Sequence, residues 1–256
     1  MVKKSNVKIP AIVIIRLIVF LFIGCIFFWL YSRTVDFLTE SVMFNVKDVL
    51  VDQSISFIDS RPLKALKAQN IFSVDLGKLH RQISSRYPQI SQLRVERQLP
   101  DTIKVLAKKR DILLQVQALN KYLAVDTEGV TMFYTTEALS FPLVRGVSLN
   151  KDKIVMGTVS SIKELNLVVQ LFKQLKSHPQ SSRLKVVTVD VGNLSKIELM
   201  VLPNIQIIID QEDLNAKLDR LEILFQNGKI NWNLVKYIDV RFKEPIINEK
   251  TPEREK

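Results

Sequence analysis

Several residue types that build catalytic and metal sites are scarce in this sequence. The 256 residues include one cysteine, two histidines, seven glycines and nine prolines. A lone cysteine forms no intrachain disulfide and offers no thiolate metal site. So few glycines and prolines exclude Gly-rich phosphate loops, collagen-like repeats and Pro-rich linkers. Hydrophobic residues make up 47% of the chain, which is enough to build cores, so we expect ordered structure along most of it.

The positive charge of the chain is unevenly distributed. Of the formal charge of +11, five units lie in residues 1–33, which contain no acid, and +6 is left for the remaining 223 residues. A nucleic-acid partner requires a concentrated basic surface. The body of the chain is only mildly basic, so we predict a solvated surface of mixed sign in preference to a specific anionic partner.

Residues 11–31, "AIVIIRLIVFLFIGCIFFWLY", contain one charge, Arg16. A helix of this length spans roughly 31 Å, which matches a bilayer's hydrocarbon core. Trp29 and Tyr31 stand at its end, where aromatic rings prefer the interface. A cleaved secretory signal is the alternative, but its apolar region is about 7 to 15 residues long and ends in a small-residue cleavage site, which "FFWLYSRTVD" lacks. We therefore predict a retained transmembrane helix.

The charges flanking this segment predict its orientation. Lys3, Lys4 and Lys8 precede it, whereas Arg33, Asp36 and Glu40 follow it with mixed sign. The positive-inside rule then makes residues 1–10 a cytoplasmic tail and places the rest of the chain outside the cytoplasm. Because chromosomal DNA is not found there, we predict no nucleic-acid partner.

Residues 43–110 predict a small α+β unit. A first strand is expected in 43–52, followed by helices in 60–68 and 73–87. "LRVERQLPDTIKVLA" alternates apolar and polar residues on both sides of Pro100 and Asp101, which indicates a hairpin. One face of this hairpin is apolar, and the two helices are the expected cover. The expected order is β-α-α-β-β.

Residues 111–247 predict a mixed β domain with flanking helices. The expected elements are a hairpin at 121–133 around Glu128 and Gly129, a helix at 159–177, strands at 184–191, 195–202 and 205–210, and a helix at 212–226. A last strand in "VKYIDVRFKEP" places Ile238, Val240 and Phe242 on one side and Tyr237, Asp239 and Arg241 on the other, and ends before Pro245. Residues 248–256 are charged and predict a disordered tail.

No pattern of catalytic residues emerges from the chain. The metalloprotease H-E-x-x-H, the hydrolase G-x-S-x-G and the P-loop are all missing. His80 and His178 fit surface histidines. Asp210, Glu212 and Asp213 fit a turn and a helix start better than a metal site. We predict no catalytic residue, cofactor or metal, and an exported enzyme remains a hypothesis without a site.

Four segments resemble the FtsQ/DivIB family of bacterial cell-division proteins. "NIFSVDLGKLHRQISSRYPQISQLRVERQLPDTIKVLAKKRD" resembles the family's POTRA domain, and departs from it at residues 109–111. "KYLAVDTEGVTMF", "FPLVRGV" and the terminal "YIDVRF" resemble its β domain, with a departure at residues 209–210. The positions that carry the first match are Asn70, Phe72, Asp75, Pro88, Val95, Arg97, Pro100, Asp101 and Thr102; in this chain we expect Arg97, Pro100 and Asp101 to be structural first.

The resemblance implies a non-catalytic divisome scaffold in the bacterial inner membrane, located at the division septum. It also implies FtsB- and FtsL-like partners and a role in controlling septal wall synthesis. If the last strand forms a sheet edge, its free backbone groups can bind an extended segment of a partner. The candidate contact residues are Tyr237, Asp239, Arg241, Phe242 and Lys243. An ordinary edge strand, blunted by Lys243 and Pro245, is the alternative for this segment, although Phe242 also fits a core position.

A different function remains open for a chain with a POTRA unit. Such units also occur in protein secretion and outer-membrane assembly systems, where they bind extended substrates by strand addition. Only about 140 residues follow residue 111, and they include two predicted helices, which is too little for a transmembrane barrel. We therefore favour the division scaffold.

Overall fold

The computed structural model describes residues 11–59, 61–149, 154–227 and 230–249. It divides into two compact units, one formed by residues 1–81 with 93–107 and the other by residues 82–92 with 108–256.

Helix α1, Ala11–Glu40, is longer than the predicted transmembrane segment. It continues for nine residues past Tyr31, because "SRTVDFLTE" contains no glycine or proline to end it. Thr34 and Thr39 donate their hydroxyls to the carbonyls four residues earlier, at 2.8 and 2.9 Å. The side chain of Asn70 donates to the Leu38 carbonyl at 2.8 Å, which satisfies one of the carbonyls that every helix end leaves unpaired. The helix is apolar and long enough to cross a membrane.

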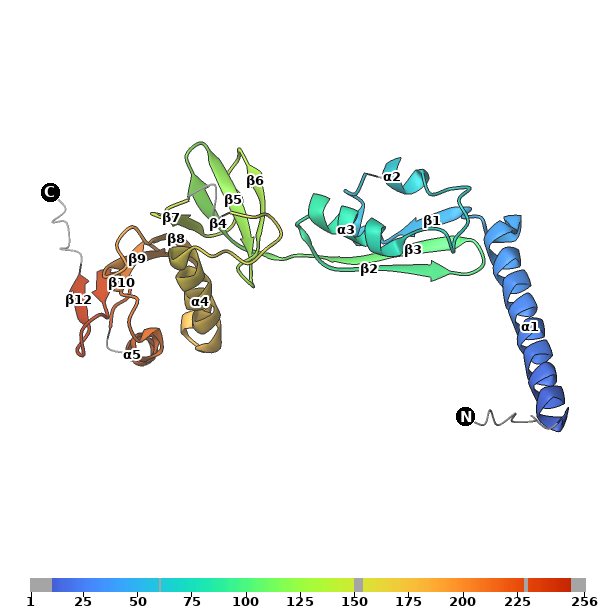
Figure 1. Ribbon diagram of the computed structural model, residues 1–256. Helices are drawn as coiled ribbons and strands as arrows, with labels where there is room; N and C mark the ends of the chain where they lie inside the picture. The colour runs from blue at the N-terminus through green and yellow to red at the C-terminus, as the bar shows by residue number, and fades with distance from the viewer. Residues whose placement is uncertain (1–10, 60, 150–153, 228–229, 250–256) are drawn as a thin grey trace, which may run out of the picture. The chain divides into compact units, whose positions relative to one another are not determined.

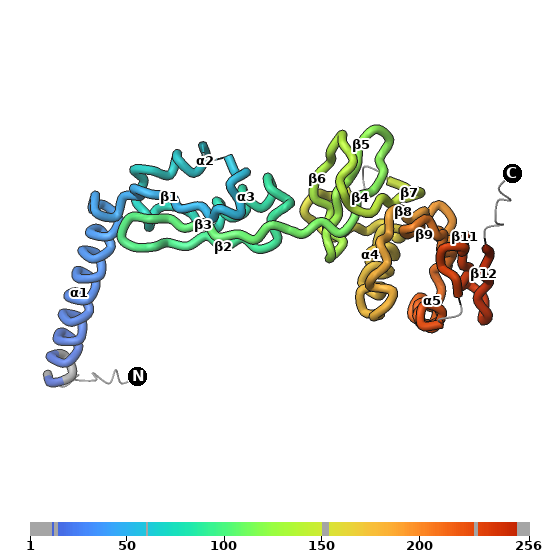
Figure 2. The backbone as a smooth tube through the Cα atoms, turned by 180° about the vertical axis from the view of Figure 1, so that it is seen from behind, coloured from blue at the N-terminus to red at the C-terminus, as the bar shows by residue number. Residues whose placement is uncertain are grey.

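The first unit contains a three-stranded sheet with the order β1-β3-β2. Strand β1 (Asp48–Val51) is parallel to β3 (Thr102–Lys109), and β3 forms a long hairpin with β2 (Ile90–Gln98), as both views of the backbone show (Figures 1 and 2). Figure 1 shows α2 (Arg61–Lys64) and α3 (Leu76–Arg86) on the same side of this sheet. The predicted order β-α-α-β-β is confirmed.

Two predicted elements of this unit are shorter than expected. The strand predicted at 43–52 is β1 alone, because the segment 44–46 pairs with 68–71 instead of joining the sheet. Ala68, at φ +69°, turns the chain into this pairing and donates to the Val46 carbonyl at 3.0 Å. The helix predicted at 60–68 is therefore only the four-residue α2, and residue 60 lies outside the described residues.

The second unit contains a nine-stranded sheet with the order β12-β11-β10-β9-β8-β7-β4-β5-β6. Its strands are β4 (Ile112–Ala118), β5 (Lys121–Asp126), β6 (Thr131–Thr135), β7 (Leu143–Arg145), β8 (Val186–Asp190), β9 (Ile197–Val201), β10 (Ile205–Ile209), β11 (Val235–Asp239) and β12 (Ile246–Glu249). The hairpin and the three strands predicted before the last helix are confirmed; β4, β7 and β12 were not predicted.

Helices α4 (Lys163–Ser177) and α5 (Leu214–Gln226) complete the core of this unit and confirm the two predicted helices. Their buried leucines and valines, with Phe172, join the apolar residues of the strands in one cluster. Asp213 caps α5 by accepting a hydrogen bond from the Ala216 amide, so its predicted place at a helix start is confirmed. Gly146 has φ +76°, and a Cβ there would lie 2.2 Å from the Gly192 amide nitrogen, so this close approach requires glycine.

The two edges of the nine-stranded sheet differ. At β6 the returning chain covers the start of the edge, because the Thr131 amide donates to the Thr158 carbonyl at 3.1 Å and the Gly157 amide donates to the Thr131 carbonyl at 2.8 Å. At the other end, β12 pairs with β11, and no second neighbour is found among the described residues. In the described part of the chain, β12 is therefore open along its whole length, whereas β6 is covered at its first residue.

Candidate partner-binding site

The terminal strand is not at the edge where we expected it. Strand β11 pairs in parallel with β10, where Tyr237 is opposite Gln206, and antiparallel with β12, where Tyr237 is opposite Asn248. The expectation that residues 237–242 form the edge strand is therefore wrong. Pairing does stop before Pro245, as predicted, but the chain reverses there and Ile246–Glu249 folds back onto β11. Residues 248 and 249, predicted to begin a disordered tail, belong to β12, so that prediction is wrong there; residues 250–256 of the predicted tail lie outside the described residues.

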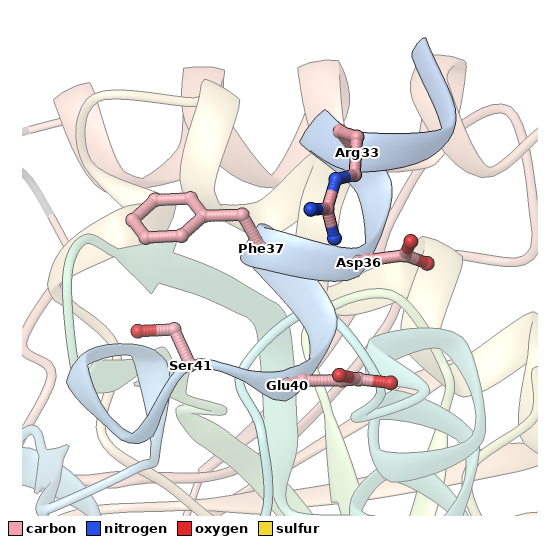
Figure 3. A pocket seen from close by; sticks show the side chains of 5 residues that line it. All are labelled: Arg33, Asp36, Phe37, Glu40 and Ser41. Carbon is pink, nitrogen blue, oxygen red and sulfur yellow. The ribbon is translucent and has the colours of Figure 1, made fainter. Parts of the chain in front are cut away.

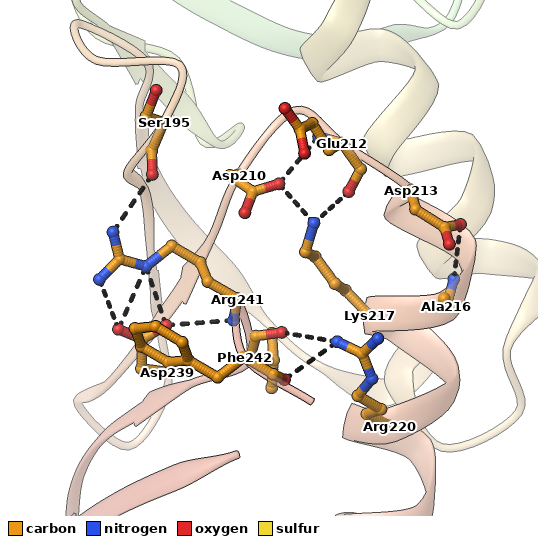
Figure 4. A network of polar contacts seen from close by, with 11 residues as sticks. Ser195, Asp210, Glu212, Asp213, Ala216, Lys217, Arg220, Asp239, Arg241 and Phe242 are labelled. Atoms are coloured by element: carbon orange, nitrogen blue, oxygen red, sulfur yellow. Dashed lines mark hydrogen bonds and ion pairs between the residues drawn. The ribbon is translucent and has the colours of Figure 1, made fainter. Parts of the chain in front are cut away.

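An ion pair between Asp239 and Arg241 closes the end of β11. The Arg241 Nη2 lies 2.7 Å from Asp239 Oδ2, and its Nε lies 3.0 Å from Oδ1 (Figure 4). The Arg241 amide also donates to the Asp239 carboxylate at 3.1 Å. The Asp239 side chain is 8% exposed and that of Arg241 is 27% exposed. Asp239 is buried, although the alternation of the sequence had suggested an outward face that it shares with Tyr237.

The electrostatics of this pair favour the charged forms of both groups. Burial alone raises the pKa of the Asp239 carboxyl, but hydrogen bonds from Arg241 and its positive charge outweigh burial and lower that pKa below its usual range. The hydrogen bonds to Asp239 raise the pKa of Arg241, against the effect of its own partial burial. The pair is therefore ionised at neutral pH and fixes the backbone after β11.

Three further contacts hold the turn that follows. Arg241 Nη1 donates to the Ser195 carbonyl at 3.2 Å, and Arg220 Nη1 donates to the carbonyls of Val240 and Phe242 at 3.2 and 3.0 Å (Figure 4). On the adjacent loop, the buried ammonium of Lys217 bonds to Asp210 Oδ1 and to the Glu212 carbonyl. These contacts connect the loops after β8, β10 and β11 at one end of the sheet.

The five predicted contact residues fall into two groups. Asp239 and Arg241 are engaged within the fold, whereas Phe242 is 51% exposed and stands with its ring centroid 5.5 Å from the Arg241 guanidinium carbon. The core position considered for Phe242 is therefore wrong. Tyr237 is half-buried and Lys243 is exposed. Sequence reasoning missed Ile246, which is 49% exposed on β12, and the arginine that fixes the turn, Arg220. The two β-branched residues directly after Pro245 could have predicted a further strand.

A second ion pair lies at the other end of the sheet. Arg110 Nη1 is 2.6 Å from Asp126 Oδ2 and 3.3 Å from Glu128 Oε2, and the Arg110 and Asp126 side chains are 13% and 4% exposed. The Arg110 Nε also donates to the carbonyls of Pro88 and Ile90 at 3.2 Å. Asp126 accepts the amides of Glu128 and Val130 at 2.8 Å, so it organises the β5–β6 turn.

His178 is not the surface histidine that we expected. Its side chain is 13% exposed, and its Nε2 lies 3.0 Å from Asp219 Oδ1. Its Nδ1 lies 2.8 Å from the Gln174 carbonyl, and this contact, together with Asp219 and against partial burial, raises the pKa of His178. The buried Glu222 accepts the amides of Gln180 and Ser181. These bonds lower the pKa of Glu222 although burial acts in the opposite direction. His80 is exposed, as predicted.

A hollow beside the end of α1 has no assigned ligand. A hollow of about 530 Å³ beside the end of α1 is lined by Arg33, Asp36, Phe37, Glu40 and Ser41 (Figure 3). All except Ser41 are exposed, so we assign no ligand to it. Within the described residues no cluster of His, Cys, Asp or Glu could hold a metal ion.

Arg97 donates to the carbonyls of Ile71 and Val74 at 2.8 and 2.7 Å, which confirms its structural role.

These features define a class of protein: one apolar helix long enough to span a membrane, then a POTRA-type unit, then a large mixed sheet without a recognisable catalytic centre in the described residues. Comparison with known families supports this assignment. Residues 61–109 match the POTRA domain of the FtsQ type, and residues 113–241 match the C-terminal region of the cell division protein FtsQ/DivIB. The chain belongs to the FtsQ/DivIB family of cell division proteins, as its motifs had predicted.

Individual relatives agree with the family assignment. The chain is 28% identical over 226 residues to the cell division protein DivIB of Clostridium tetani, a match that covers 85% of this chain and 84% of the relative. It is 24% identical to DivIB of Clostridium acetobutylicum, over 78% of this chain and 80% of the relative. It is also 24% identical to the cell division protein FtsQ of Syntrophotalea carbinolica, over 70% and 63% of the two chains.

Proposed function

We propose that this chain is a non-catalytic scaffold of the division machinery, anchored by α1 in the cytoplasmic membrane at the septum. Residues 1–10 would be cytoplasmic, and the parts at 43–110 and 111–247 would act outside the cytoplasm as the POTRA and β domains. Its partners would be FtsB- and FtsL-like membrane proteins, through which it would help to control septal wall synthesis. Family membership, the charge asymmetry around α1 and the open β12 edge support this proposal.

The observation that carries the binding mode is the edge at β12. An exposed edge presents unpaired backbone groups that accept an added strand, and outward side chains then select the partner. Phe242, Lys243 and Ile246 are exposed beside or on this strand, so we propose them, with Tyr237, as contacts. Asp239 and Arg241 would act indirectly, by fixing the turn from which β12 begins.

Charge placed at the edge tests this binding mode. We expect Phe242→Glu and Ile246→Lys each to weaken capture of the FtsB-like protein of the same organism by at least tenfold, because each removes an exposed apolar contact and adds a charge at the edge. Val187→Lys, on β8, changes an exposed valine four strands away and is the matched control. The measurement is a titration of the full chain in nanodiscs; unchanged affinity in both edge variants would refute the β12 site.

The cellular role is tested separately. A fluorescent fusion of the full chain should form a band at mid-cell, and depletion should produce filaments. Uniform envelope fluorescence together with normal division would contradict the scaffold proposal, whatever the edge variants show.

A further inference from the structure

A hollow of about 380 Å³ lies in the second unit at the start of β7. The hollow exists because β7 has only three residues. Leu143, the first residue of β7, is opposite Gln115 on β4 and Thr188 on β8. Two residues earlier, β4 presents Leu113 and β8 presents Val186, and both line the hollow. Because the chain departs at Pro142, the space that a longer β7 would fill stays open between β4 and β8.

The floor of this hollow is apolar. Leu113, Phe172 and Leu175 form part of the lining and belong to the core, with 9%, 8% and 4% of their surfaces exposed. Leu184 and Val186 are half-buried and add to the apolar wall. The volume is near the lower end of the roughly 300 to 1,000 Å³ of ligand pockets. It therefore suits one or two apolar side chains better than a large cofactor.

The rim is positively charged. Lys176, in the last turn of α4, and Lys185, just before β8, both line the hollow and are exposed. Neither has a carboxylate partner among the described residues. Residues 165–189 carry four lysines and arginines and no aspartate or glutamate. The carboxylate of Glu222 is close to the lining residue Ser181, but it accepts hydrogen bonds from the amides of residues 180 and 181.

We propose that this hollow docks an extended acidic segment of a partner protein. One apolar side chain of that segment occupies the hollow, and carboxylates on either side of it pair with Lys176 and Lys185. The charge of the rim selects an anionic segment, and the apolar floor selects the anchor residue. The site is separate from β12, because β7 is five strands away in the sheet, about 24 Å at the usual strand spacing. A strand bound at one place leaves the other free.

Peptide titrations test the proposal with the full chain in neutral-lipid nanodiscs. The probes are fluorescein-labelled peptides, Asp-Glu-X-Glu-Asp, in which X is leucine, phenylalanine, valine or serine, and a leucine-centred peptide with lysines in place of the acids. Fluorescence anisotropy should show saturable binding of at least one apolar-centred acidic peptide. The serine-centred and lysine-flanked peptides should bind at least tenfold more weakly.

Variants assign this binding to the hollow. The double change Lys176→Glu with Lys185→Glu should weaken binding at least tenfold, whereas Lys173→Glu, an exposed reversal on α4 outside the lining, should change it less than twofold. Ser182→Phe keeps both charges and adds a ring at the exposed rim, so it should also weaken binding. It serves as the second test if the double variant does not fold by circular dichroism.

Three results would overturn the proposal. Equal affinity for leucine- and serine-centred peptides would mean that only charge is recognised. Unchanged binding by both Ser182→Phe and the charge-reversed chain would place the peptide elsewhere. If anionic phosphatidylglycerol vesicles bind in a way that requires Lys176 and Lys185, and no acidic peptide binds, then the ligand of the hollow is a lipid surface and not a protein segment.

Discussion

The two ends of the nine-stranded sheet carry similar ion pairs but differ in how far the edge strand is covered. Each end has an Asp–Arg pair at the last residue of a strand, Asp126 with Arg110 and Asp239 with Arg241. At the β6 end the pair joins residues 16 positions apart in sequence, and the returning chain covers the first residue of the edge strand. At the β12 end the pair is local, two residues apart, and the edge stays open in the described structure. Similar ion pairs therefore lie beside a partly covered edge at one end of the sheet and beside an open edge at the other.

The difference shows how a sheet can be stable while one of its edges stays open. An uncovered edge favours aggregation unless it is short or blunted. Strand β12 has four residues, ends in Glu249 and follows Pro245, so the open edge is both short and flanked by features that discourage nonspecific pairing. The Arg110–Asp126 pair at the β6 end can then contribute to stability without covering the β12 edge.

Removing Arg110 should produce the largest effect. Arg110→Met leaves the buried Asp126 carboxylate without its cation, which costs about 3 kcal/mol or more. In a Trp29→Phe background, Trp232 is the remaining tryptophan and packs against the core of the second unit, so its fluorescence reports urea unfolding there. Arg145→Met, at an exposed arginine, should stay within about 0.5 kcal/mol. Equal stability of Arg110→Met and Arg145→Met would show that the buried pair does not stabilise the closed end.

Removing Arg241 should cost less, about 1 to 2 kcal/mol, because the Arg241 amide still donates to Asp239 and water reaches the site. The folded pKa of Asp239 is lowered, so the stability it contributes is fully present above the unfolded value of 3.8 and is lost as pH falls through the folded pKa. Unfolding free energies of wild type and Arg241→Met should therefore converge in acid. A gap that stays constant down to pH 2.5 would assign the effect to packing.

The smallest effect is expected at the contact between α4 and α5. Asp219 is 67% exposed, so His178→Asn should cost less than about 1 kcal/mol. The folded pKa of His178 is raised, which means that its contribution is fully present below the unfolded value of 6.5 and is lost as pH rises through the folded pKa. The difference between wild type and variant should shrink between pH 5.5 and 8.5. If the difference grew over this range, the assigned direction of the shift would be wrong.

Local patterns predicted much of the fold. The hairpin around Pro100 and Asp101 and the helices α3, α4 and α5 follow from alternation or helical spacing within one segment. The long end of α1 could have been predicted too, since residues 32–40 contain no helix breaker. The first predicted strand and helix were too long because residues 44–46 pair with 68–71, a contact between segments that no local pattern reveals.

The candidate site was harder to predict for the same reason. The exposed Phe242 and the terminal motif could be read from the sequence, but the place of a strand within a sheet depends on which segments return to it. Strand β12 takes the edge from β11, and Ser195 and Arg220 reach the turn from distant segments. Asp239 alternates like an outward residue, yet its ion pair with Arg241 allows it to be buried.

The length of α1 has a consequence at the membrane surface. Thirty residues make a helix of about 45 Å, whereas the hydrocarbon layer is about 30 Å thick. The nine residues after Tyr31 add about 14 Å, more than the roughly 5 to 8 Å occupied by one layer of lipid headgroups. In an upright helix, the turns after Tyr31 therefore extend past the headgroups, and the last of them, at Leu38, is held by Asn70 of the first folded unit.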